Sequence, residues 1–113
     1  MKDVNIARKF ITKYKDAKAR GLEFDISLVS FKNMMKSKKC AISGMLLTDS
    51  NRDPARFSDR TVDRIDSNKG YVKGNVMCVC SGINKFKGIL ENNEHPMNLE
   101  SVEKVIKVMK SVK

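Results

Sequence analysis

The chain has 113 residues, of which 41% are hydrophobic and 32% are charged, a balance typical of one small globular domain. No apolar run is long enough for a membrane span or a secretory signal, so we expect a cytoplasmic protein without a membrane partner. Lysine and arginine total 23 against 13 aspartate and glutamate residues, and the net charge of +10 favours a nucleic-acid partner, contacted mainly through its phosphates. A ribosome-associated or simply soluble lysine-rich protein is the alternative.

Residues 3–20 are predicted to form a helix, because apolar residues recur at three- and four-residue spacing. The basic residues of this segment lie largely off the apolar stripe, and they suit either a solvated face or a phosphate-contacting surface. After a connector over residues 22–26, a second helix is predicted from a cap at Ser27 to about residue 39. Its expected buried side chains are those of Leu28, Phe31, Met34 and Met35.

Residues 40–60 carry turn formers and no helical period, so we expect an irregular loop. Residues 61–66 and 71–79 are predicted to be paired strands around a turn at 67–70, and residues 81–90 a helix. Asn98 is expected to cap a last helix to residue 112, with a buried stripe. That stripe comprises Leu99, Val102, Val105, Ile106 and Met109. We therefore predict one α+β domain over residues 1–113, in which the helical parts 1–39 and 98–112 pack around a hairpin–helix unit at 57–90.

The cysteines Cys40, Cys78 and Cys80 form an odd set. With no secretory signal in view, this set predicts a reducing compartment and no disulfide framework.

The stretch from residue 61 to residue 87 carries an acidic strand residue, a Gly-Tyr turn, an asparagine on the second strand and an Asn-x-x-Lys helix. These residues are Asp63, Gly70, Tyr71, Asn75, Asn84 and Lys87. In this order and spacing the segment resembles the HNH endonucleases, especially the small HNH-like proteins common in bacteriophages. Upstream, residues 21–24 and 40–44 are similar to the lead-in of that family. The resemblance implies a ββα-metal (His-Me finger) core and a DNA endonuclease that depends on Mg²⁺ or Mn²⁺.

The resemblance also implies roles for individual residues. Asp63 would be the strand ligand of the metal and Asn84 the helix ligand, and such a sparse oxygen set suits Mg²⁺. Asn75 would brace the loop and orient the catalytic group. Lys87, one turn after Asn84, would face the scissile phosphate.

The position that follows the first aspartate is usually a histidine that activates water, and here it is Arg64. Arginine stays protonated and cannot act as an ordinary base, although it can clamp a phosphate. Three alternatives follow: another group does the base work, such as Asp66 or a metal-bound hydroxide; cleavage is slow; or the scaffold binds DNA without cleaving it. Asp66 is also a further candidate metal ligand. A structural salt bridge at the strand end is the plain interpretation of the Asp63–Arg64–Asp66 cluster, and replacement of Arg64 by histidine is expected to supply a base.

Many relatives also carry two Cys-x-x-Cys knuckles that bind zinc. Here the knuckle positions are Cys40 and Ser43, then Cys80 and Ile83, so two thiolates are missing and we expect no zinc. Cys40 and Cys80 are more simply small buried residues. The only histidine, His95, is expected to be an exposed loop residue.

Phe57, Tyr71 and Phe86 are expected to pack in the core, with the Tyr71 hydroxyl free to form a hydrogen bond.

Two hypotheses follow, an endonuclease that nicks or cuts DNA, and a nuclease-fold module that grips DNA or a nucleoprotein without hydrolysis. In both, basic residues around the motif would contact the phosphate backbone. They are Arg60, Lys69, Lys73, Lys85 and Lys87. A phage or host protein is a further candidate partner, and a phage-encoded protein would act in the host cytoplasm.

Overall fold

The computed structural model describes residues 2–50 and 52–112, and within them the chain forms four helices and four short strands. The predicted α+β class is therefore confirmed. The elements in chain order are α1 (Asp3–Ala19), β1 (Phe24–Asp25), α2 (Leu28–Met34), β2 (Arg60–Arg64), β3 (Tyr71–Val72), β4 (Val76–Cys80), α3 (Ser81–Glu91) and α4 (Leu99–Ser111).

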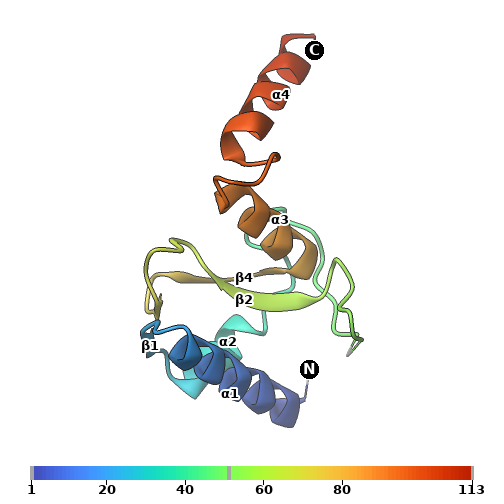
Figure 1. Ribbon diagram of the computed structural model, residues 1–113. Helices are drawn as coiled ribbons and strands as arrows, with labels where there is room; N and C mark the ends of the chain where they lie inside the picture. The colour runs from blue at the N-terminus through green and yellow to red at the C-terminus, as the bar shows by residue number, and fades with distance from the viewer. Residues whose placement is uncertain (1, 51, 113) are drawn as a thin grey trace.

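The centre of the molecule is an antiparallel pair of strands, β2 and β4, in which Thr61 lies opposite Val79 and Asp63 opposite Met77. Helix α3 begins at the residue that follows β4. In Figure 1 the strand pair separates α1 and α2 on one side from α3 on the other. The expected succession of two paired strands and a helix is present, and it sets side chains of β2 against side chains of α3.

The hydrophobic core lies where β2 and β4 meet α1 and α2. Its largest fully buried side chains include Phe31 and Val62, each 1% exposed, and Val79. The expectation that Cys40 and Cys80 are small buried residues is confirmed, and Cys78 is buried with them as a free thiol. Because apolar side chains hold α1 and α2 against β2, the position of α1 relative to β2 is set by the core rather than by a polar contact.

The predicted return strand over residues 71–79 is in fact two strands. A turn at Gly74, whose φ of +84° favours glycine, separates β3 from β4. Strand β3 pairs in parallel with β1, with Phe24 opposite Tyr71, so the segment 22–26 is more than a connector. A Cβ on Gly70 would collide with the Glu23 backbone oxygen, which shows how closely the two segments approach.

Helix α2 is shorter than predicted and ends at Met34. The backbone then turns, and Lys39 forms an isolated bridge to Leu46, so the lysine-rich segment 36–39 is not helical. The cap at Ser27 is present, since its Oγ accepts from the backbone N–H of Ser30. Phe31 and Met35 are buried as expected, but Leu28 is exposed.

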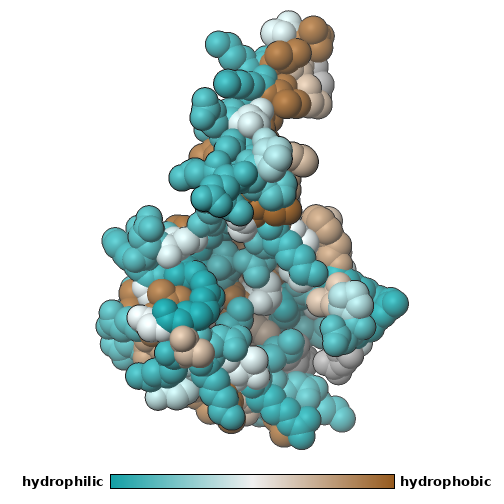
Figure 2. Space-filling view, in the orientation of Figure 1, coloured by the Kyte–Doolittle hydropathy of each residue, from teal (hydrophilic) through white to brown (hydrophobic). Residues whose placement is uncertain are grey.

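The expected packing of the C-terminal helix is wrong. Asn98 caps α4 by accepting from the Ser101 backbone N–H, but the helix extends away from the body of the molecule beyond α3 (Figure 1). The stripe predicted to be buried is largely exposed, with Leu99 at 52%, Val105 at 58% and Met109 at 53%. Figure 2 shows hydrophobic surface along one side of α4 and hydrophilic surface on the other. The spacing predicted an amphipathic helix correctly, but not what covers its apolar face.

No helix in the described part of the chain is both long enough and apolar enough to cross a membrane.

Candidate active site

A cleft of about 480 Å³ opens between α1 and α3, at the end of β2. Strand β2 contributes Asp63 and Arg64, α3 contributes Asn84, Lys87 and Glu91, and α1 contributes Lys13, with Arg20 at its C-terminal cap. Further polar lining comes from Tyr71, Ser67 and Asn92. Four cationic side chains therefore share the cleft with two carboxylates, and the cleft is suited to an anionic ligand.

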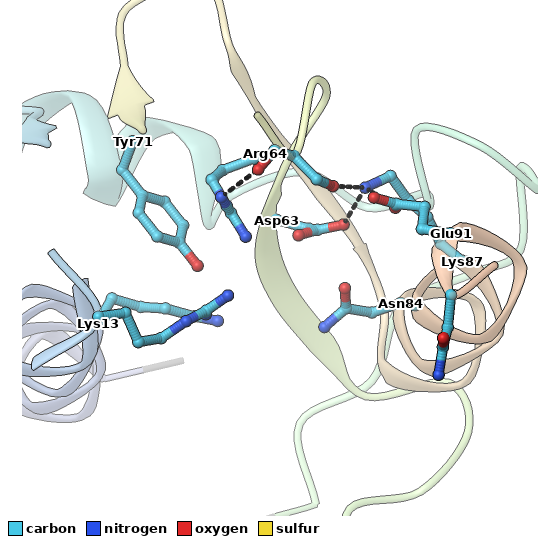
Figure 3. A pocket seen from close by; sticks show the side chains of 11 residues that line it. Lys13, Asp63, Arg64, Tyr71, Asn84, Lys87 and Glu91 are labelled. Carbon is cyan, nitrogen blue, oxygen red and sulfur yellow. Dashed lines mark hydrogen bonds and ion pairs between the residues drawn. The ribbon is translucent and has the colours of Figure 1, made fainter. Parts of the chain in front are cut away.

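The cleft brings together three residues that the sequence singled out, Asp63, Asn84 and Lys87. Asp63 faces α3, whereas Val62 before it points into the core and Arg64 after it turns towards Tyr71. On α3, Asn84 and Lys87 are three residues apart and share one face, and Gly88 leaves the space beside them open. Figure 3 shows the Asn84 amide directed towards the Asp63 carboxylate.

Lys87 is held at the centre of a polar network. Its Nζ lies 3.2 Å from Asp63 Oδ2 and 2.7 Å from Glu91 Oε1, and donates to Ser67 Oγ at 3.0 Å (Figure 3). Burial lowers the pKa of Lys87, but the hydrogen bonds to Glu91 and Asp63 outweigh it, so the pKa lies above the ordinary value of lysine. Burial raises the pKa of Glu91, and the bonds from Lys87 and Ser67 lower it further than burial raises it. Lys87 therefore stays charged in the cleft.

Arg64 is buried, only 7% exposed, and its guanidinium lies 5.5 Å from the centre of the Tyr71 ring. Its Nη1 donates to the backbone oxygens of Ser67 at 2.8 Å and Lys69 at 3.1 Å, and so ties the loop after β2 to the strand. The Nε atom is buried without an acceptor among the described residues. Arg64 is thus both a brace for this loop and a cation at the wall of the cleft.

Asn75 makes the bracing contacts that were expected of it. Its Nδ2 donates to the backbone oxygens of Asp66 and Gly70, and its Oδ1 accepts from the Asp66 backbone N–H at 2.9 Å. The side chain is buried and does not line the cleft. It fixes the loop that presents Ser67 to Lys87.

Two predicted site residues lie elsewhere. Asp66 does not line the cleft, because its carboxylate folds back to accept from the Asn68 backbone N–H at 2.9 Å. Arg60 is not a free phosphate-binding residue, since its Nη1 donates to the backbone oxygens of Met35 and Ser37 and its Nε to Asp49 Oδ1 at 2.7 Å. The side chain of Arg60 ties α2 to β2. Lys69, Lys73 and Lys85 are exposed.

Other residues of the cleft were missed by the sequence interpretation. Lys13 lies on α1 and Arg20 caps its C-terminal end, and the sequence left open whether the basic residues of this segment form a solvated face or a phosphate-contacting surface. Lys13 lies 5.9 Å from the centre of the Tyr71 ring. Burial lowers the pKa of Lys13, and Arg20 and Lys9 add to this, against a smaller opposite effect of Asp63 and Asp16. The only signal for Glu91 was its spacing of four residues from Lys87.

A buried carboxylate sets where α3 begins. Asp59 accepts hydrogen bonds from Thr48 Oγ1, from the hydroxyl and backbone N–H of Ser50, and from the Arg56 backbone N–H. Its own backbone oxygen accepts from the Ser81 backbone N–H, and that of Phe57 from Gly82, at the first turn of α3. The loop 48–59 therefore holds the helix that carries Asn84 and Lys87.

The Cys40 thiol is more acidic than an ordinary cysteine. Burial raises the pKa of Cys40, but hydrogen bonds from Ser43 and backbone groups lower it more, to about 6. Across residues 2–50 and 52–112, His, Cys, Asp and Glu side chains do not gather in threes as they would around a metal ion. His95 is half-buried outside the cleft, where its Nδ1 accepts from the Met97 backbone N–H.

The three aromatic residues expected in the core have different environments. Tyr71 is buried at 4% exposed, and its ring packs against Phe24 at 5.7 Å between centres. Phe57 and Phe86, by contrast, are exposed at 55% and 40%. The expectation of core packing is therefore confirmed for Tyr71 and wrong for the other two.

Comparisons with known proteins give one relative. The chain is 35% identical over 71 residues to an uncharacterized 29.0 kDa protein from the dda-modA intergenic region of Enterobacteria phage T4. The match covers 63% of this chain and 27% of the phage protein, so the chain spans less than a third of that relative. No family model matches the chain. No solved structure matches it either.

Proposed function

We propose that the chain is a phage-encoded, HNH-like DNA endonuclease that requires a divalent metal ion and whose reaction centre is the cleft between β2 and α3. The observation that supports this most is the convergence of Asp63, Asn84 and Lys87 in one cationic cleft. Strands β2 and β4 with α3 would then be the ββα-metal core of that family. The similarity to a phage T4 protein supports the phage origin.

The donor atoms in the cleft fit Mg²⁺ or Mn²⁺. Asp63 offers a carboxylate of which only Oδ2 is paired with Lys87, and Asn84 offers an amide oxygen from the facing helix. Both are hard oxygen ligands, and Mg²⁺ commonly completes its shell with water and substrate phosphate oxygens. A bound metal ion would supply Lewis-acid stabilisation of charge on the scissile phosphate.

The chain's own residues would hold the phosphodiester and balance its charge. Lys87, kept protonated by its carboxylate partners, presents its ammonium to the cleft one helical turn from Asn84. Glu91 and Ser67 position Lys87, and Asn75 positions the loop of Ser67. The transition state carries more charge on the phosphate oxygens than the ground state does, so a fixed ammonium here favours cleavage.

The test is nicking of supercoiled plasmid DNA in Mg²⁺ and in Mn²⁺, with EDTA as the blank. Asp63→Ala should reduce the nicking rate by orders of magnitude, because the loss of metal-dependent stabilisation costs several kcal/mol. Affinity for DNA should persist or rise, since a negative charge near phosphate is removed. Asp25→Ala, which removes an exposed carboxylate from β1, is the matched control and should nick at the wild-type rate.

A second candidate function is a nuclease-fold module that binds DNA without cleaving it. Two observations favour it: Arg64 is a buried cation where relatives have a base, and among the described residues no histidine lines the cleft. This alternative predicts salt-sensitive DNA binding with no nicking in either metal. Equal nicking by Asp63→Ala and wild type would instead show that the reaction centre is not in this cleft.

A further inference from the structure

Three cationic side chains line the part of the cleft beside Tyr71 and the C-terminal end of α1. Lys13, Arg20 and Arg64 all line the cleft, and none forms an ion pair within the described part of the chain. The two carboxylates of the cleft are engaged instead on the α3 side, where both contact Lys87. The cleft therefore has one side, around Lys87, where the cation is paired with both carboxylates, and another side, around Tyr71, where the cations form no ion pair and Asp63 acts on Lys13 only at longer range.

Arg64 supplies a second and independent sign of a missing anion. It is 93% buried, and its Nε has no acceptor among residues 2–50 and 52–112, although its Nη1 is satisfied by two backbone oxygens. A buried donor of this kind is normally matched by an acceptor, and a charged donor most of all. Figure 3 shows the ends of Arg64 and Lys13 directed towards the same space beside the Tyr71 ring.

The placement of Lys13 also fits a ligand rather than a solvated surface. Its ammonium lies 5.9 Å from the centre of the Tyr71 ring, and the side chain is only partly exposed, unlike its helix neighbours Lys15 and Lys18. Burial disfavours the charged form of Lys13 in the free protein and Arg20 and Lys9 add to this, and together they outweigh the opposite effect of Asp63 and Asp16. A phosphate oxygen at this position would relieve both effects, because it would bring a counter-charge to two cations together.

We infer that Lys13, Arg20 and Arg64 form an anion site for a backbone phosphate, separate from the scissile position beside Asp63 and Asn84. That the anion belongs to nucleic acid rests on the proposed function, whereas the anion site itself does not. On this basis α1 is part of the substrate-binding machinery, and the DNA strand passes between α1 and α3. Arg64, which cannot act as a base, has a role here as a phosphate ligand.

The anion site is tested first with inorganic phosphate, at constant ionic strength set by sodium chloride. Phosphate at 100-fold its dissociation constant should raise the melting temperature of the wild type by about 5 °C or more. The variant Lys13→Met/Arg20→Met should lose this shift. The control Lys15→Met/Lys18→Met removes the same charge from exposed positions of the same helix and should keep it.

The melting temperatures without phosphate show whether the variants fold. Lys13→Met removes a partly buried cation without an ion-pair partner, so without phosphate it should melt at or above the wild-type temperature, which separates loss of binding from loss of structure. An equal phosphate shift in Lys13→Met/Arg20→Met and in wild type would overturn the anion site, and so would the absence of any shift in wild type.

The assignment to a nucleic-acid phosphate is tested with a 20-base-pair duplex in EDTA, by fluorescence anisotropy. Lys13→Met/Arg20→Met should weaken binding about 10-fold or more and reduce the log–log salt slope by about 1 to 2, while the control pair changes affinity less than about threefold. If the phosphate shift is found but the DNA affinities of the two pairs are equal, the anion site stands and its assignment to DNA is wrong. If duplex binding follows the expectation but no nicking occurs, this inference stands and the proposed endonuclease activity is wrong.

Discussion

The carboxylate of Asp59 is the clearest place to test how the fold supports the cleft. It is 7% exposed and accepts hydrogen bonds from four donors in the loop 48–59. Burial raises its pKa, but the hydrogen bonds from Ser50, Thr48 and Arg56 lower it more, from 3.8 to about 2. A difference of this size between the folded and unfolded chain corresponds to about 2 kcal/mol in the free energy of unfolding.

The sign of the pH dependence follows from the depressed pKa. Because the folded protein holds the proton less tightly than the unfolded chain, the stabilisation is fully present above about pH 4 and is lost as pH falls through about 2. Asp59→Asn should therefore lower the free energy of unfolding at pH 7 by about 2 kcal/mol. The amide NH2 group would replace one acceptor oxygen and would face loop groups that are themselves hydrogen-bond donors. The difference from wild type should shrink between pH 4 and pH 2.

The measurement is urea unfolding followed by circular dichroism at pH 7, 4, 3 and 2. Asp53→Asn is the matched control, because it makes the same change in charge at an exposed position of the same loop and should leave the free energy of unfolding within about 0.5 kcal/mol of wild type. If Asp59→Asn and Asp53→Asn gave the same values at all four pH values, the proposed hydrogen-bonding role of Asp59 would be refuted.

Two further predictions concern the close contact of glycines with neighbouring segments and the packing of helix α4. Gly70→Ala should cost more than about 2 kcal/mol, because the new Cβ would overlap the Glu23 backbone oxygen, whereas Gly82→Ala should cost less than Gly70→Ala, because the atoms nearest to its new Cβ belong to the exposed ring of Phe57, which can turn away. Urea midpoints that fail to separate the two variants would contradict this. Removal of residues 93–113 should change the melting temperature by less than about 3 °C, since α4 buries little of its apolar face; a fall above about 10 °C would show that α4 belongs to the cooperative core.

The hairpin and the helix that follows it could be predicted from sequence because their signals are local. Residues 61–66 precede a turn at 67–70, residues 81–90 repeat with a helical period, and both were found within one or two positions of β2 and α3. The pairing of β1 with β3 could not be predicted in this way. It joins Phe24 to Tyr71, which lie 47 positions apart in the sequence, and two-residue strands carry no period of their own.

The same difference between local and long-range signals explains which residues of the candidate site could be predicted. Asp63, Asn84 and Lys87 were predicted together because they belong to one motif. Lys13 and Arg20 belong to a separate helix and its C-terminal cap, and only tertiary packing brings α1 to the mouth of the cleft. The sequence assigned Arg60 to DNA contacts because charge alone does not distinguish a free guanidinium from one that donates to backbone carbonyls of the protein. The stripe of α4 was expected to be buried for a related reason, since amphipathicity predicts an apolar face but not its partner.

The replacement of Arg64 by histidine shows how the structure changes an expectation drawn from sequence. By sequence, histidine at this position supplies a base near neutrality. In the structure, Arg64 holds the backbone oxygens of Ser67 and Lys69 with one nitrogen. A shorter imidazole cannot reach both oxygens and would leave at least one of these carbonyls without its donor, so Arg64→His should lower the free energy of unfolding by about 1 kcal/mol. Under the anion-site proposal it should also weaken duplex binding, and any gain in nicking rate should appear only at saturating DNA concentration. Urea unfolding, anisotropy and single-turnover nicking of Arg64→His and wild type give the three readouts, and an unchanged stability with unchanged affinity would show that Arg64 neither braces the loop nor contacts phosphate.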